Sequence, residues 1–204
     1  MESKNVYFLF YKPKGVLSTM SDPSDRMTIS NFTERIKYRV FPVGRLDYDS
    51  EGLIILTNDG DFSQKLGHSK LEIPRTYLVK LKFDLSEDQI KKLSSGVTLP
   101  GGKSKVLRIE KVHYGSKDHP WYRVTLTDSK NEQLRKMFEN FYIDILKLKR
   151  ISIGQLKLGN MNAGEILEIT PAKALLAFKT QKVMEFGHRL KSRAQRQKSL
   201  KRIN

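Results

Sequence analysis

The stretch VGRLDYDSEGLIILTNDG, residues 43–60, joins an acidic turn to an apolar run. The run GLIILT has the length of a strand and only its last residue is polar, which predicts a strand buried on both faces. Asp47, Asp49 and Glu51 alternate just before this run, and Arg45 precedes them. The sequence therefore predicts a loop that presents carboxylates at the edge of a buried sheet.

The rest of the chain predicts more strands than helices. Strand patterns occur at residues 5–11, 39–43, 75–83, 105–115, 121–128, 144–154 and 164–170. Helical spacing occurs at residues 58–69, 85–96, 131–141 and 171–186. The strands follow one another as hairpins and split β-α-β units, without strict alternation. This order predicts an α+β fold, with a mixed, largely antiparallel sheet flanked by helices.

Positive charge is the most informative bulk property of the chain. Lys and Arg outnumber the acids 38 to 22, which gives a formal net charge of +16. The last segment, residues 187–204, holds seven of these cations and no acid, so about +9 remains on the body (16 − 7). Such a balance favours a polyanionic partner, although a solvated, lysine-rich surface would also produce it.

Cysteine is absent and no apolar run approaches 18 residues. The first feature excludes disulfides, thiol nucleophiles and Cys-ligated zinc, and it suits a reducing compartment. The second predicts that no helix spans a membrane. We therefore expect a cytoplasmic protein.

Three interpretations compete for the acidic turn. Asp, Ser and Gly are common turn residues, so the acids could simply be hydrated on a surface loop. Alternating carboxylates can also ligate Ca²⁺, but Arg45 beside them disfavours a cation. The third interpretation is a catalytic carboxylate, Asp47, which a nearby arginine would keep ionised at neutral pH.

Five stretches of the chain resemble motifs of the pseudouridine synthases of the RsuA type, which act on ribosomal RNA. The acidic turn is similar to their catalytic motif, and the other matching stretches follow in the family's order. These are YKPKG (11–15), RTYLVK (75–80), NEQLRKMF (131–138) and the closing KRISIGQLKLGNMNAGE (149–165). The first motif begins only eleven residues into the chain, as in the short, RluE-like branch that lacks an S4-type RNA-binding domain.

The resemblance implies the pseudouridine synthase fold, with a central active-site cleft, and isomerisation of uridine to pseudouridine within RNA. This reaction needs no cofactor and no metal. Asp47 would be the essential carboxylate, either attacking C1′ of the ribose or removing the 2′ proton. Arg135 would pair with Asp47, Tyr77 would stack on the extruded uracil, and Arg45 would help to open the duplex or fill the space that the base leaves. Further RNA contacts are expected from Lys12, Lys130, Asn131, Gln133 and Lys136.

Other interpretations remain open at this stage. Tyr77 alternates with Val79 and Leu81, so the pattern alone favours a core aromatic. A glycosidase would use two carboxylates, and a non-catalytic factor for ribosomal RNA binding or ribosome assembly would need only the charge. The expected partner is ribosomal RNA, with 23S favoured over 16S, and the chain is expected to be a monomer.

The expected domain organisation is one catalytic domain, residues 1–185, followed by a basic tail, residues 186–204. The catalytic domain could comprise two α+β subdomains, one of residues 1–60 with the late strands and one of residues 61–130. The tail is expected to contact phosphates without base specificity.

Overall fold

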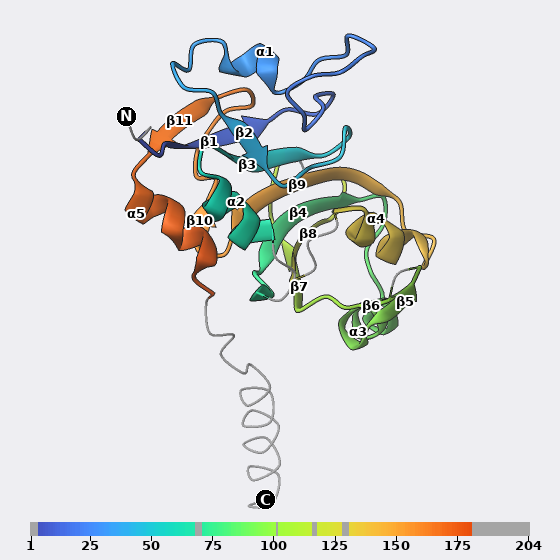
Figure 1. Ribbon diagram of the computed structural model, residues 1–204. Coiled ribbons are helices and arrows are strands. Elements are labelled where there is room, and N and C mark those ends of the chain that lie inside the picture. Colours follow the sequence, from blue (N-terminus) through green and yellow to red (C-terminus); the bar gives the residue numbers. More distant parts are fainter. Residues whose placement is uncertain (1–3, 68–70, 101, 116–117, 128–130, 181–204) are drawn as a thin grey trace, which may run out of the picture.

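The computed structural model describes residues 4–67, 71–100, 102–115, 118–127 and 131–180. The predicted basic tail, 186–204, lies outside these residues. One large sheet runs through the molecule and carries helices on both faces (Figure 1). The prediction of a mixed, largely antiparallel sheet with flanking helices is confirmed.

Eleven strands are present in the described residues. They are β1 (Tyr7–Lys12), β2 (Phe41–Val43), β3 (Glu51–Thr57), β4 (Arg75–Leu81), β5 (Val97–Leu99), β6 (Gly102–Ser104), β7 (Arg108–Val112), β8 (Trp121–Leu126), β9 (Ile145–Ile153), β10 (Leu156–Lys157) and β11 (Ile166–Ile169). The helices are α1 (Ser30–Thr33), α2 (Gly60–Gly67), α3 (Glu87–Ser95), α4 (Asn131–Glu139), α5 (Pro171–Ala174) and the 3₁₀-helix η2 (Leu175–Phe178). β5 and β6 form a separate hairpin in a region where the sequence predicted only a turn.

The main sheet has the strand order β11-β1-β3-β9-β4-β8-β7, with β2 and β10 pairing at the side. Among the described strands, β3 and β9 make the one parallel pairing, and it comprises only two residue pairs, Glu51 with Lys149 and Gly52 with Arg150. This short pairing joins two antiparallel halves of the sheet. The predicted division into subdomains stays a prediction.

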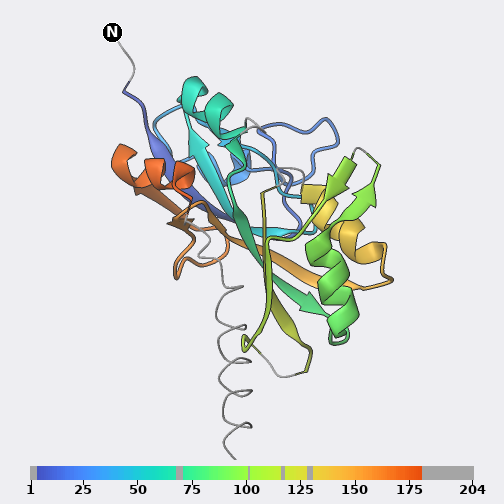
Figure 2. The same cartoon turned by 90° about the horizontal axis from the view of Figure 1, so that it is seen from below.

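Each face of the sheet carries its own apolar core because the strand residues alternate between the faces. Phe8 and Phe10 of β1 belong to the core that also contains Leu134 and Phe138 of α4. Figure 2 shows α3, α4 and the β5–β6 hairpin grouped over the end of this face. The neighbouring β1 residues Tyr7, Leu9 and Tyr11 enter the opposite core, beneath α2, α5 and η2.

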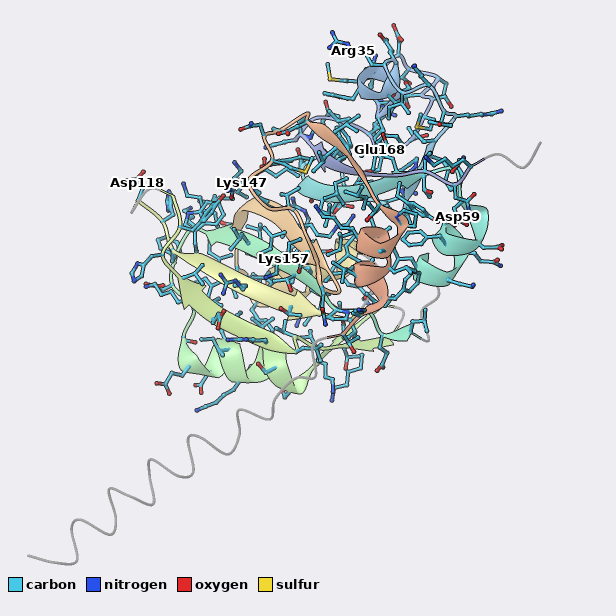
Figure 3. The ribbon with its side chains drawn as sticks, turned by 90° about the vertical axis from the view of Figure 1, so that its left-hand side faces the viewer. Arg35, Asp59, Asp118, Lys147, Lys157 and Glu168 are labelled. Carbon is cyan, nitrogen blue, oxygen red and sulfur yellow. The ribbon has the colours of Figure 1, made fainter. Side chains whose placement is uncertain are left out.

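Local capping explains where several elements begin. Ser86 caps α3 in a reciprocal capping box with Gln89, as its sequence pattern predicts. Asp59, labelled in Figure 3, accepts a hydrogen bond from the backbone amide of Phe62 at the start of α2, 2.9 Å away. In both helices a side chain thus accepts a hydrogen bond from a first-turn backbone amide that has no partner within the helix.

Of the helix expected over residues 171–186, residues 181–186 lie outside the described ranges, and the described part is not helical throughout. It continues from α5 into η2, and Lys179 is already extended. The carbonyl of Leu176 accepts bonds from the amides of Gln155, at 2.9 Å, and Lys179, at 3.1 Å. This tightened turn ends the helix at Phe178. None of the helices within the described ranges is long and apolar enough to cross a membrane.

Gly52→Ala is expected to destabilise the fold, because Gly52 has φ +111° and an added Cβ would collide with the backbone carbonyl of Arg150. We expect a loss of about 2–4 kcal/mol in the free energy of unfolding, measured by denaturant titration. Gly60→Ala is the matched control, since nothing lies within 4 Å of its added Cβ, and it should cause no loss. Equal stability of the two variants would contradict the proposed role of this contact.

Candidate active site

The loop that carries Asp47 leaves the sheet where β3 changes partners. β2 pairs with β3 only as far as Val43 opposite Ile55, whereas β9 takes the same edge of β3 at Glu51 and Gly52. The intervening residues 44–50 are therefore displaced from the sheet into a turn. The split edge of β3 thus places Asp47 beside the junction of the two halves.

A second loop, which follows β1, holds the Asp47 loop in place. The amide of Gly15 donates to the carbonyl of Tyr48 at 2.8 Å. The hydroxyl of Ser18 donates to the carbonyl of Leu46 at 2.6 Å and accepts from its amide at 2.9 Å. These three bonds bracket Asp47 on both sides and fix the backbone that presents its carboxylate.

Arg150 connects the Asp47 loop to β9. Its side chain is buried, and its Nε donates to the carbonyl of Leu53 at 2.8 Å. Its Nη1 contacts the carbonyl of Arg45 at 3.5 Å. One guanidinium therefore holds both the loop before Asp47 and the strand after it.

Asp47 itself faces Arg135 from α4. The distance between Asp47 Oδ2 and Arg135 Nε is 3.7 Å, and both side chains are about one-quarter exposed, 29% and 25%. Arg135 also donates from Nη2 to the hydroxyl of Ser50 at 3.3 Å. Asp47 Oδ2 is buried and accepts no hydrogen bond from the described residues, so this ion pair is its main protein contact.

Lys12 supplies a second positive charge near Asp47. The side chain is fully buried, and its Nζ donates to the carbonyls of Pro13 at 2.9 Å and Val16 at 2.7 Å. Burial lowers the pKa of Lys12 to about 8, while the negative charge of Asp47 acts in the opposite direction. An RNA phosphate at the surface cannot reach this ammonium. We therefore propose that Lys12 positions the loop and adds positive charge beside Asp47. This role would take the place of the direct RNA contact expected from the sequence.

The three acids of the turn have separate partners. Asp49 lies 3.9 Å from Lys14 at the surface. Glu51 accepts from the Tyr11 hydroxyl at 3.0 Å and lies 3.2 Å from Lys147. They do not converge on one point, and the described residues contain no cluster of His, Asp and Glu placed to hold a metal ion. Side-chain pairs thus contact Asp49 and Glu51.

Tyr77 lies within β4 and is only 1% exposed. It stands opposite Arg150 in the β4–β9 pairing and belongs to the same core as Leu46, the residue before Asp47. The structure therefore places Tyr77 in the wall behind the Asp47 loop. A base that stacks on its ring would first have to displace neighbouring atoms.

The remaining predicted residues are arranged around α4 and the loop. Arg45 is exposed, as is Lys136 on α4. Gln133 is buried, and its Oε1 has no hydrogen-bond partner among the described residues. The side chain of Asn131 is not described, and Lys130 lies outside the described residues. These positions stay predictions for RNA contact.

A family model for RNA pseudouridylate synthases matches residues 6–140. The chain belongs to this family. It is therefore an RNA pseudouridine synthase, an enzyme that isomerises uridine within RNA. The alternatives of a glycosidase and of a non-catalytic RNA-binding factor gain no support from the comparisons.

Individual relatives agree with this assignment. The chain is 39% identical over 171 residues to ribosomal large subunit pseudouridine synthase B of Bacillus subtilis (strain 168), covering 81% of this chain and 68% of that protein. It is 36% identical over 169 residues to the dual-specificity RNA pseudouridine synthase RluF of Escherichia coli (strain K12), covering 82% and 56%. The crystal structure of a pseudouridylate synthase superposes with a TM-score of 0.72 at 25% identity, covering 85% and 74%.

The motifs of this pseudouridine synthase did not point to all the residues that hold Asp47. Ser18, Ser50 and Arg150 were missed. The sequence pattern does indicate that Arg150 is buried. It follows Leu148 by two residues on β9 and therefore points to the same inward face of the sheet as Leu148. An arginine at an inward strand position needs partners, and here these are backbone carbonyls. Ser18 and Ser50 are common turn residues, so the sequence alone does not distinguish them.

Asp47→Asn should lower the pKa of Lys12 further below about 8. Removing the nearby negative charge disfavours the protonated amine, whereas its burial remains. The Lys12 side chain can be followed by NMR during a pH titration. Asp49→Asn is the control and should cause a smaller fall, because Asp49 contributes least among the charges that act on Lys12. An unchanged midpoint in Asp47→Asn would show that the two groups do not interact.

Proposed function

We propose that this pseudouridine synthase isomerises a specific uridine in large-subunit ribosomal RNA, with Asp47 as its essential carboxylate. The observation that carries the residue assignment is the Asp47–Arg135 pair, 3.7 Å apart, on a loop tied to both halves of the sheet. The substrate assignment is supported by relatives named ribosomal large subunit pseudouridine synthase.

The reaction leaves the composition of the uridine unchanged. The N1–C1′ bond breaks, the uracil turns, C5 bonds to C1′, C5 loses its proton and N1 gains one. Asp47 acts either as the nucleophile at C1′ or as the base that removes the 2′ proton. In both routes its carboxylate must be aimed before the base arrives, which the held loop and the contact with Arg135 provide.

Three cations lie around the Asp47 loop. Arg135 makes the direct contact, Arg150 holds the adjoining backbone, and Lys12, with a pKa of about 8, is mostly protonated at neutral pH. Negative charge that develops in the reaction would find these groups already oriented. Such fixed charges contribute more in a site with little water than in solution.

Tyr77 and Arg45 act on the base in this proposal. The uridine must leave the RNA stack, which costs a few kcal/mol. Stacking on Tyr77 offsets part of that cost, and the exposed Arg45 occupies the vacated space or opens the duplex. The Tyr77 hydroxyl removes the proton from C5. Because Tyr77 is buried in the structure, entry of the base requires the neighbouring loop to move.

The extent of the catalytic domain, the oligomeric state, the location and the RNA substrate belong to the same proposal. The catalytic domain would extend to about residue 185, and the basic tail, 186–204, would add phosphate contacts without base specificity. The enzyme would act as a monomer in the cytoplasm, on 23S rather than 16S ribosomal RNA. The charge of the chain, +16, supports a polyanionic substrate.

Asp47→Asn is expected to abolish turnover while RNA affinity and folding persist, because amide and carboxylate differ little in size. The free energy of unfolding should change by no more than about 1 kcal/mol. Tritium release from C5 of labelled ribosomal RNA measures turnover, since only pseudouridine formation frees that atom. Asp49→Asn, two residues away, is the control and should stay active. Activity of Asp47→Asn close to that of the unmodified chain would rule out the assignment.

Tyr77→Phe should cause a large loss of turnover but little loss of RNA affinity, because the ring is kept and only the hydroxyl is removed. The same tritium assay and a binding titration separate the two effects. Tyr122→Phe is the matched control, a buried tyrosine on the neighbouring strand β8 whose hydroxyl bonds to Asp84 at 2.9 Å. It should keep its turnover at saturating RNA. Normal product formation by Tyr77→Phe would mean that the hydroxyl removes no proton.

A further inference from the structure

Tyr142 is the most exposed of the large hydrophobic side chains that the structure describes. It is 98% exposed, and Phe83 follows with 72%. Single exposed apolar side chains are common on protein surfaces, whereas exposed apolar side chains that lie in one region mark an interaction site. Neither ring contributes to the two apolar cores.

The backbone at Tyr142 makes its side chain more unusual. Its φ is +55°, in the left-handed region. The amide of Tyr142 donates to Glu139 at 2.9 Å, and that of Ile143 donates to Phe138 at 3.1 Å. These two bonds form a Schellman cap at the end of α4, in which Tyr142 takes the position that glycine normally occupies. A tyrosine there strains the backbone and adds no packing, so folding does not account for it.

Phe83 lies on the turn next to Tyr142. β4 and β9 pair at Leu81 and Ile145, and beyond this pair the amide of Lys82 donates to the carbonyl of Asp144 at 3.4 Å. The turn after β4 and the turn before β9 are therefore joined. The ammonium of Lys82 lies 5.5 Å from the centre of the Phe83 ring. The two exposed rings thus share one end of the sheet with a cation.

We propose that Tyr142 and Phe83 form a stacking platform for an unpaired base of the RNA that flanks the target uridine. The proposal deepens the function proposed above and rests on it. Bases stack on exposed aromatic rings irrespective of sequence, and a lysine beside a ring also attracts the phosphate chain. No group in this platform takes part in the isomerisation.

Position and charge favour RNA over a protein partner. β4 carries the chain four residues from Tyr77 to Leu81, about 13 Å at the rise of a strand, and Phe83 lies two residues beyond its end. That distance fits a flanking segment and excludes the flipped base itself. α4 leads to Tyr142 from Arg135 and Lys136, so RNA leaving the site has a continuous path to it. Glu139 and Asp144 are the exposed acids nearby, while Asp84 is paired with Lys111 at 2.8 Å.

The test compares two fluorescent RNA hairpins, one with and one without a short single-stranded extension, at fixed salt. Tyr142→Gly should weaken binding of the extended hairpin by about 5- to 150-fold and leave the other hairpin unaffected. Phe83→Ser should act in the same direction, and Tyr142→Phe should bind as tightly as the unmodified chain. Leu175→Ala, which trims another exposed apolar side chain, 53% exposed, is the matched control and should change neither affinity.

Thermal stability provides a second measurement, because the two possible roles of Tyr142 predict different changes in Tm. Tyr142→Gly relieves the left-handed strain, so its Tm should be unchanged or higher by up to about 4 °C. A structural role for Tyr142 would instead lower the Tm. Weaker RNA binding by an equally or more stable protein is the combination that supports the proposal.

Other outcomes would overturn the platform. Normal binding of the extended hairpin by Tyr142→Gly would do so, and so would an equal loss with both hairpins. Normal RNA binding together with altered self-association in sedimentation would assign the rings to a contact between copies of the chain. The binding measurement does not depend on turnover. If the unmodified chain bound the RNA but did not isomerise it, this result would count against the ribosomal RNA assignment and not against the platform.

Discussion

The close approach of Gly52 to Arg150 is the contact on which the arrangement of this enzyme depends. Two residue pairs join the halves of the sheet there, and only a residue without a side chain allows the backbones to meet. The guanidinium of Arg150 then bonds to carbonyls on both sides of the Asp47 loop. One local constraint thus sets the continuity of the sheet and the position of the carboxylate.

Buried charge lies close to the proposed catalytic carboxylate, Asp47. Lys12 and Arg150 are both buried, and both donate hydrogen bonds to backbone carbonyls of neighbouring segments. Burying such groups costs solvation energy, and apolar residues of similar size would often give a more stable core. The arrangement favours a fixed electrostatic environment for Asp47, at the expense of stability. Perturbed ionisable groups commonly gather at functional sites for this reason.

Local patterns in the sequence predicted the elements well where a single physical rule decides them. Alternation revealed β4, the capping box revealed α3, and the apolar run revealed β3. Motif resemblance supplied Asp47, Tyr77 and Arg135, which no periodicity could distinguish from ordinary loop, core and surface residues. Contacts between distant segments were not predictable. The roles of Ser18 and Arg150 depend on carbonyls 28 and 97 residues away.

The proposed catalytic groups come from both sides of the two-pair junction. Asp47 belongs to the half built on β1 and β3, whereas Tyr77 and Arg135 belong to the half built on β4 and β8. One apolar core crosses this junction, because Phe10 and Ile54 of the first half belong to it together with Tyr77 and Leu134 of the second. This packing holds the two halves at one angle, and a change of that angle would alter the spacing of all three groups together. Since a displacement of about 1 Å can cost on the order of 100-fold in rate, core packing far from Asp47 also limits how fast the enzyme can work.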